Sequence, residues 1–117
     1  MTESSWGGDD LRMRRMARNE MLARHVNERI ERAGNAQPHE RLGLICECSD
    51  ADCRTVVNLT EEQYRNVRRH PERFIVVLGH ETAVVERVVE RHGGWAITEK
   101  VGLAREVAQQ NARHNDT

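Results

Sequence analysis

All three cysteines of the chain fall within eight consecutive residues, from Cys46 to Cys53, in the pattern Cys-x-Cys-x4-Cys. Packing alone does not favour such a cluster, because a core cysteine behaves as a small hydrophobic residue. Thiolates two and five positions apart at a strand end or turn can converge on one tetrahedral ion. The spacing therefore predicts a metal site that staples this segment, and the alternative is a redox-active thiol cluster.

The composition gives such a staple a structural purpose. At 117 residues the chain predicts a single domain, with 38% hydrophobic and only 3% aromatic residues. Since each large aromatic side chain buries roughly 150–250 Å², this chain has a thin core, and small cores are commonly supplemented by a structural metal. Zn²⁺ is favoured over an iron–sulfur cluster, which usually requires four cysteines in other spacings.

The cysteine count and the first residues predict a cytoplasmic protein. Three cysteines are an odd number, which argues against a disulfide framework. Residues 1–8 lack the basic start and apolar stretch of a signal peptide. No apolar run approaches the roughly 20 residues of a membrane span. We therefore expect reduced thiols and no membrane association.

A tetrahedral site with three cysteines needs one more ligand. The candidates are His39, His70, His80, His92, Asp50 and Asp52. We favour His80, because it directly follows the most apolar run of the chain and Gly79 allows a close backbone approach. The predicted set is Cys46, Cys48, Cys53 and His80, a closed structural arrangement. The alternative for the histidine is a surface or capping role.

An open fourth position, filled by water, would make the same centre catalytic. The sequence has no independent catalytic signature: it contains no phosphate-binding glycine loop, no nucleophile elbow and no HExxH motif. We therefore predict that the protein is not an enzyme and assign no catalytic residues.

A long amphipathic helix is predicted upstream of the cysteines. Residues 1–10 are expected to form a disordered tail, and the helix should run from Leu11 to Arg32 before the stop signal Gly34-Asn35. Its apolar residues are spaced by three and four: Met13, Met16, Ala17, Met21, Leu22, Val26, Ile30 and Ala33. The other face is predicted to be basic and solvated: Arg12, Arg14, Arg15, Arg18, Arg24 and Arg29.

This helix is the predicted partner-binding element. We expect a protein partner to contact Arg14, Arg15, Arg18, Met16 and Met21. A basic amphipathic helix also suits nucleic acid, although the net charge of −1 gives the whole chain no general attraction to it. Homodimerisation through the methionine-bearing face and a merely solvated arginine face are the remaining alternatives.

The rest of the chain predicts an α+β fold, in which a single zinc-binding domain spans residues 11–108. Two β-rich runs around the turn 49–52 predict a hairpin with the cysteines at its tip. Alternation places Leu42, Leu44, Cys46 and Cys48 on the buried face and Glu47 on the opposite face.

Further elements are expected after this hairpin. A capping box at residues 60–63 opens a short helix that ends near residue 70, and residues 74–78 should form a central strand. Residues 82–91 fit a helix or a strand, and we favour a hairpin with residues 95–98. Residues 103–108 predict a short helix, and residues 109–117 a loose tail.

Two resemblances accompany these patterns. The cysteine spacing resembles the zinc-binding tail that follows SET methyltransferase domains, where three such cysteines share a zinc with a residue from elsewhere. That likeness covers eight residues and implies metal binding alone. Between about Arg18 and Lys100 the chain is similar to small uncharacterised actinobacterial proteins that have a CEC…C cluster and a later Gly-His pair. The matching segments are Asn27-Glu28-Arg29-Ile30, Cys46-Glu47-Cys48, Cys53, Leu59-Thr60, Tyr64, Val67-Arg68, Phe74, Gly79-His80 and Glu86-Arg87-Val88-Val89-Glu90.

The second resemblance implies that the three cysteines and His80 form one set, and it implies no activity. Leu78 stands where that family is expected to have proline. Together these observations predict a small zinc-binding module that acts as a regulatory protein-interaction domain. The alternatives are a nucleic-acid-binding transcriptional regulator that uses the arginine-rich helix and a thiol/zinc redox sensor.

Overall fold

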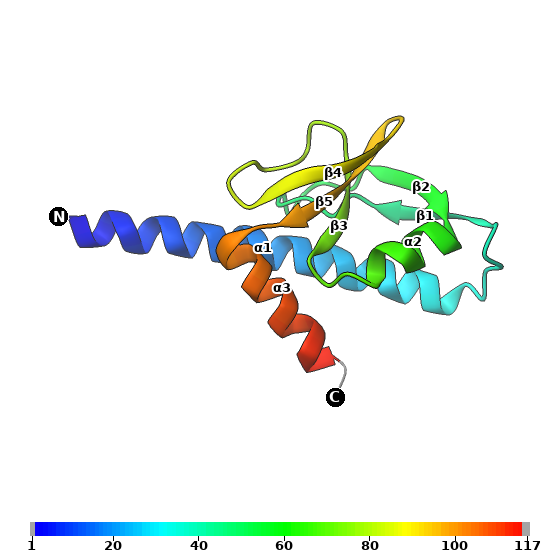
Figure 1. The fold of residues 1–117 in the computed structure, drawn as a ribbon, viewed down its shortest axis with the longest axis horizontal. Helices are drawn as coiled ribbons and strands as arrows, with labels where there is room; N and C mark the ends of the chain where they lie inside the picture. Colours follow the sequence, from blue (N-terminus) through cyan, green and yellow to red (C-terminus); the bar gives the residue numbers. More distant parts are fainter. Residues whose placement is uncertain (1, 116–117) are drawn as a thin grey trace.

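The computed structural model describes the backbone of residues 2–115 and the side chains of residues 11–110. Its elements follow the chain in the order α1 (Thr2–Ala33), β1 (Arg41–Ile45), β2 (Val56–Thr60), α2 (Glu61–Arg68), β3 (Arg73–Val77), β4 (Glu86–His92), β5 (Trp95–Lys100) and α3 (Gly102–Asn115). The predicted α+β class is confirmed. Figure 1 shows α1 running beneath the strands, with α3 descending from the same side.

The strands form two small antiparallel sheets. β1 pairs with β2 in the predicted hairpin, and β5 pairs with both β3 and β4. The β4–β5 pairing resolves the ambiguity of residues 82–91 in favour of the hairpin. Thr60 caps α2: its side chain accepts the Gln63 backbone N–H, while the Gln63 side chain accepts the Thr60 backbone N–H. The predicted capping box is therefore confirmed.

The prediction of a central strand at residues 74–78 is wrong, because β5 is central and β3 lies at the edge of its sheet. The outer edge of β3 is nevertheless covered by the segment after β1. The Glu47 N–H donates to the Ile75 carbonyl at 2.7 Å, and the Glu47 carboxylate accepts the Ile75 N–H at 2.9 Å. An edge strand covered in this way can be as apolar as a central one, which explains the misassignment.

The buried face of α1 also differs from the predicted stripe. Ala17 and Met21 are buried as expected, but Leu22 and Val26 are 57% and 45% exposed. Polar side chains take the inward positions instead: Glu20, Arg24 and Asn27. Burial of polar groups is tolerated where they find partners, so the face of α1 is decided by those partners and not by hydrophobicity.

A buried ionic cluster supplies the partner of Glu20, whereas Arg24 finds its partners on β3. Lys100, the only lysine of the chain, donates to both Glu20 and Glu86 inside the protein. Arg24, predicted to be solvated, lies over the Phe74 ring at 3.8 Å from its centroid and donates to a backbone carbonyl. Lys100 lies 4.4 Å from the same ring centroid. Cation–π contacts of this kind are strongest when desolvated.

Both terminal helices are longer than predicted. The backbone of residues 2–10 continues α1 where a disordered tail was expected, and α3 runs to Asn115 instead of ending near residue 108. Once a helix is nucleated, each added residue gains a backbone hydrogen bond, which favours such extension. Residue 1 and residues 116–117 lie outside the described part. No helix within the described residues has the length and apolar character needed to cross a membrane.

Candidate metal centre

The cysteines lie on the loop of residues 46–55 that joins β1 to β2 at the tip of the hairpin, and we call this loop the knuckle. Just beyond β1, the Cys46 N–H donates to the Thr55 carbonyl at 2.9 Å and extends the hairpin ladder by one step. The loop then reverses in a turn closed by the Cys53 N–H and the Asp50 carbonyl at 3.1 Å. The Asp50 carboxylate accepts the Asp52 N–H at 2.9 Å, an Asx turn that supports the reversal.

His80 reaches the knuckle from a tight turn after β3. The His80 N–H donates to the Val77 carbonyl at 2.9 Å, and Gly79 between them has a φ of 93°. This left-handed conformation favours glycine, because a Cβ there would be strained against the backbone. The Gly-His pair noted in the sequence thus aims the imidazole at the cysteines.

These two segments bring all four predicted ligand residues together. The cysteine sulfurs and a nitrogen of His80 lie within 4.8 Å of one another. His80 Nδ1 is 3.7 Å from Cys46 Sγ and 3.6 Å from Cys53 Sγ. Zinc–sulfur and zinc–nitrogen bonds of about 2.3 and 2.0–2.1 Å at tetrahedral angles would separate such atoms by about 3.6 Å. The arrangement could therefore hold a metal ion such as Zn²⁺.

Burial of the cysteines makes a cation chemically appropriate. Cys46 and Cys48 are 1% and 3% exposed, and burial raises the pKa of both thiols in the metal-free protein. Only a bound cation would make the thiolate form favourable at these positions. The Cys46 sulfur also accepts the Val77 backbone N–H at 3.2 Å, a contact that would stabilise a thiolate.

Cys53 lies at the more open side of the centre, where the His80 side chain is exposed. Burial acts to raise the pKa of the Cys53 thiol, but hydrogen bonds from Thr55, Cys48 and His80 outweigh it and lower this pKa to about 7. The three thiols thus differ: two are buried and one is accessible from solvent.

The other candidate ligands do not join this group among the described residues. Asp50 and Asp52 are exposed on the knuckle, and His39 is exposed in the linker before β1. His92 stacks on Trp95 with ring centroids 4.4 Å apart. His70 lies after α2 and, with His92, lines a separate hollow against the β4–β5 hairpin.

Glu47 is the supporting residue that sequence reasoning misplaced. Strand alternation put it on the face opposite the cysteines, yet its side chain is fully buried. Its carboxylate accepts hydrogen bonds from Tyr64 Oη and Asn27 Nδ2, each at 2.9 Å, in addition to the bond from Ile75. Asn27 also donates to the Ile45 carbonyl and accepts its N–H. The only signal for this network in the sequence was that Glu47, Tyr64 and Asn27 lie in the segments that carry the resemblance to actinobacterial proteins.

The predicted partner-binding residues divide into two groups. Arg14, Arg15 and Arg18 are exposed on α1, and Met16 is half-buried. Met21 is only 5% exposed and packs in the core, although it lies at the base of a surface hollow that Arg14 and Arg18 also line. This placement follows from the rotation of α1 toward its buried polar face.

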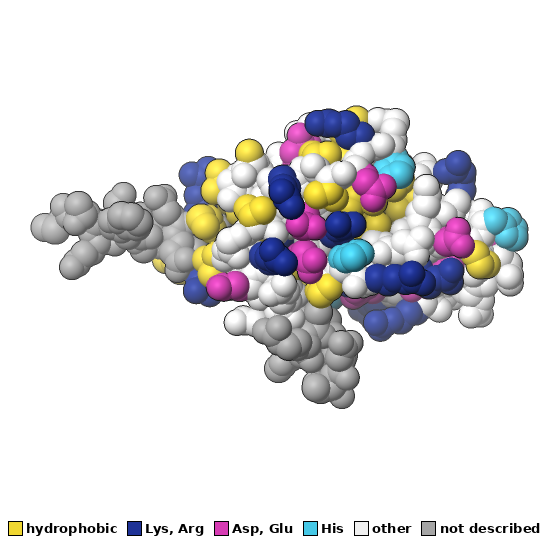
Figure 2. Space-filling model, viewed as in Figure 1, with side chains coloured by type: hydrophobic (Ala, Val, Ile, Leu, Met, Phe, Trp, Pro, Cys, Tyr) yellow, Lys and Arg dark blue, Asp and Glu magenta, His cyan; other side chains and the backbone are white. Residues whose placement is uncertain are grey.

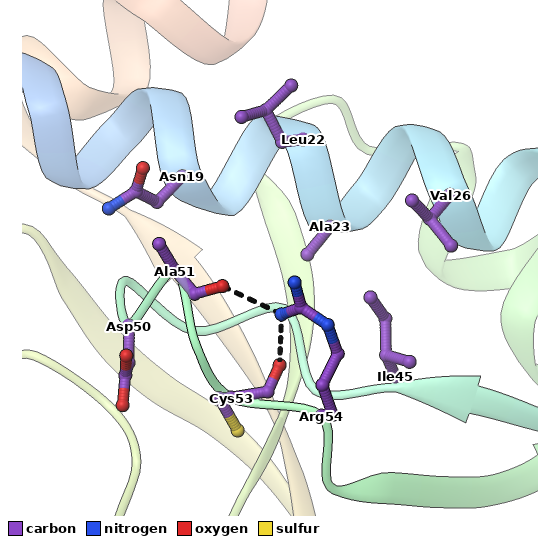
Figure 3. Close-up of a pocket in the computed structure, with 9 residues that line it drawn as sticks. All are labelled: Asn19, Leu22, Ala23, Val26, Ile45, Asp50, Ala51, Cys53 and Arg54. Atoms are coloured by element: carbon purple, nitrogen blue, oxygen red, sulfur yellow. Dashed lines mark hydrogen bonds between the residues drawn. The ribbon is translucent and has the colours of Figure 1, made fainter.

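A groove adjoins the metal centre on the other side of the knuckle. It is lined by α1, the end of β1 and the loop that carries Cys53 (Figure 3). The lining residues are Asn19, Leu22, Ala23, Val26, Ile45, Asp50, Ala51, Cys53 and Arg54.

Comparisons of the chain with protein-family models, curated proteins and solved structures find no match. The resemblance to actinobacterial proteins therefore stays a prediction, supported only by the Cys/His group that it implied.

Proposed function

We propose that the protein is a small regulatory interaction module whose fold is held by a structural Zn²⁺ bound to Cys46, Cys48, Cys53 and His80. The observation that supports this best is the convergence of four zinc-type donor atoms within 4.8 Å. They come from two segments that are separated in the chain by the strands β2 and β3 and the helix α2. A set of this kind matches closed Cys₃His sites.

The donor set favours a structural role over a catalytic one. Three thiolates and one imidazole complete a tetrahedron and leave no position for an activated water, whereas catalytic zinc sites have three protein ligands. When bound, the ion would neutralise most of the charge of the three thiolates and crosslink the β1–β2 knuckle to the turn after β3. The neighbouring backbone N–H of Val77 would stabilise the Cys46 thiolate.

The zinc proposal is tested by metal analysis of reduced, tag-free protein. We expect one zinc per chain in the wild type and its loss in Cys48→Ser and His80→Ala. His92→Ala is the matched control, because that ring stacks on Trp95 away from the centre. Substitution with Co²⁺ should give the absorption of a tetrahedral thiolate site. A wild-type protein without zinc, or a His80→Ala variant that retains it fully, would contradict the proposed ligand set.

The interaction role rests on α1, which exposes apolar and basic side chains together. Leu22 and Val26 are about half exposed, and exposed arginines flank them along the helix. Apolar surface rimmed by polar residues is typical of protein-binding sites. The zinc-bound fold would hold this helix at the surface, where a partner protein could bind it. Binding to the module would then regulate the activity of that partner.

A thiol/zinc redox sensor is the second candidate, favoured by the partial exposure of Cys53 beside buried Cys48. In such a sensor, hydrogen peroxide would oxidise the two thiolates to one disulfide, with two electrons and two protons reducing the peroxide to two waters. Loss of two ligands would release the zinc. Zinc release by stoichiometric peroxide, reversed by a thiol reductant, would support this role. Retention of zinc under peroxide would exclude it.

A further inference from the structure

We propose that the groove between α1 and the knuckle binds an acidic amphipathic segment of a partner protein, and that zinc is required to keep the groove formed. The proposal deepens the proposed function and rests on it, because one wall of the groove is the loop that carries the ligand Cys53. An aliphatic side chain of the partner would enter the groove, and its carboxylates would pair with the arginines at the rim.

The floor and the helical wall of the groove are apolar. Leu22, Ala23 and Val26 of α1 line it together with Ile45 at the end of β1. In Figure 3 Ala23 and Val26 are directed toward Ile45, whereas Leu22 points away from the loop that carries Cys53. The two larger helical side chains are about half exposed, at 57% and 45%. The groove encloses about 240 Å³, less than the roughly 300–1,000 Å³ of small-molecule sites. This size suits one or two side chains of a docking segment better than a cofactor.

Arg54 provides a cation inside this apolar surface. One nitrogen of its guanidinium donates to the Ala51 and Cys53 carbonyls, at 2.7 and 2.9 Å, which holds the side chain across the loop. Figure 3 shows the rest of the guanidinium directed toward α1, between Ala23 and Ile45. Both bonds use the same nitrogen, Nη1. Among the described residues, the other N–H groups of the Arg54 guanidinium are therefore left to bind a carboxylate. A guanidinium on an apolar floor is a strong carboxylate site.

Two more cations lie on α1 beyond the residues that line the groove. Arg18 precedes Leu22 by four residues and Arg29 follows Val26 by three, so both share the exposed face of α1 with the apolar pair. Both arginines are exposed. Asp50 is the one acidic residue among those lining the groove, and its carboxylate already accepts the Asp52 N–H. An apolar groove with Arg54 in its lining and two further arginines along the adjoining helix is complementary to an aliphatic segment flanked by Asp or Glu.

The loop wall depends on the metal centre. Arg54 follows Cys53 directly, and its side chain is held by the carbonyls of the knuckle itself. The loop is further tied to α1 by a hydrogen bond from Asn19 Nδ2 to the Ser49 carbonyl at 2.9 Å. Removal of zinc would free Cys48 and Cys53 from the ion that they share. The loop would then lose the position that forms the groove.

The test is selection of binding peptides from a random display library, with segments of about 15 residues or four helical turns, on zinc-loaded wild-type protein. We expect enriched peptides to carry aliphatic residues at helical spacing with Asp or Glu beside them. Leu22→Asp and Arg54→Ala should each weaken binding of these peptides by about tenfold or more, as at interface hot spots. Leu11→Asp is the matched control, since Leu11 is a 63% exposed α1 residue outside the groove, and it should bind them unchanged.

Zinc content of every variant, measured in parallel, separates the two proposals. If the groove variants retain zinc and still bind the peptides at full affinity, the groove proposal is overturned while the zinc centre stands. If the wild type holds no zinc, the proposed function fails first. Peptide binding that survives chelation overturns the zinc requirement. A wild-type dimer that Leu22→Asp dissociates would overturn the choice of occupant, because a second copy would then fill the groove. Enrichment of basic peptides would overturn the charge argument.

Discussion

At the scale of single residues, Glu47 lies between two candidate ligands, Cys46 and Cys48, but its own contacts stabilise the fold. Its backbone and its carboxylate both bond to Ile75 on β3, while the carboxylate also binds Tyr64 on α2 and Asn27 on α1. Hydrogen bonds to an ionised acceptor are roughly twice as strong as neutral ones. One side chain thus connects three elements directly behind the metal centre.

We predict that Glu47→Gln lowers the free energy of unfolding by about 1–3 kcal/mol, because the amide replaces an acceptor oxygen with a donor that faces other donors. Urea unfolding at neutral pH measures the change. Glu106→Gln, at an exposed position of α3, serves as the control and should be close to neutral. Equal stability of the two variants would show that the buried carboxylate is dispensable.

Gly79 provides a second test at this scale, since its φ of 93° aims His80 at the cysteines. A Cβ there would meet no neighbouring atom within 4 Å, so the penalty of Gly79→Ala is backbone strain alone. Strain of about 1–2 kcal/mol should weaken zinc affinity by about five- to thirtyfold, measured by competition with a chromophoric chelator. Gly94→Ala, also without a close neighbour and without positive φ, should bind zinc normally. An unchanged affinity in both variants would refute the role of the turn.

At the scale of elements, the three-stranded sheet is fastened across its central strand by an ion-pair network. Glu99 on β5 pairs with Arg87 on β4 and Arg73 on β3, each at 3.2 Å, and it is the register partner of both. The hydrogen bond from Arg87, together with that from Arg73, lowers the pKa of the Glu99 carboxyl despite the opposing effect of burial.

This lowered pKa predicts a pH-dependent contribution to stability. The folded protein binds the Glu99 proton more weakly than the unfolded chain, whose carboxyl has a pKa near 4.5. The contribution is therefore fully present above that value and is lost as the pH falls through the lower pKa of the folded state. Glu99→Gln should reduce stability at pH 7 by a few tenths to about 1 kcal/mol, since the network is partly solvated. Chemical unfolding from pH 7 to 3 should show this difference shrinking, and a constant difference would contradict it.

At the scale of the whole molecule, the candidate metal centre lies where the two sheets meet. Three of its ligands follow β1 in one sheet, and the fourth follows β3 in the other. Cys46, Cys48 and the surrounding aliphatic residues also belong to the main hydrophobic core. A bound ion would therefore crosslink the core as well as the knuckle.

Chelation is predicted to destabilise the entire domain. Zinc binding free energy adds to folding free energy in small metal-stapled domains, so removal should lower the midpoint of thermal unfolding and broaden the transition. Circular dichroism of the reduced protein, with and without a strong chelator, measures the effect, and re-addition of zinc should reverse it. Identical melting curves in both conditions would show that the core folds without the ion.

The distribution of charge on one face of the molecule can be compared with what binding to a nucleic acid requires. On the face in Figure 2, basic and acidic side chains are interspersed, and the whole chain has a net charge of −1. Binding to a phosphate backbone requires a concentrated basic surface and falls steeply with salt. The arginines beside Leu22 and Val26 are therefore better matched to a short acidic segment than to a nucleic acid.

Much of the architecture was determined by the sequence alone, because the relevant signals are local. The cysteine spacing, the capping box at Thr60, the β1–β2 turn and the β4–β5 turn each depend on residues within about ten positions of one another. The structure also brings together Cys46, Cys48, Cys53 and His80, the four residues predicted as ligands, and the Gly-His pair directly after an apolar run was the local signal for His80. These features follow from backbone geometry and ligand chemistry.

Only the tertiary structure decided which side of α1 is buried, where β3 lies in its sheet and where Glu47 points. In each case a polar group is buried because a distant partner receives it: Glu20 meets Lys100 eighty residues later, and Asn27 meets the edge of β1. Hydrophobic periodicity treats such groups as solvent-facing, whereas a paired polar group can be buried at little cost. The same rotation of α1 left Leu22 and Val26 at the surface and formed the groove beside the metal centre.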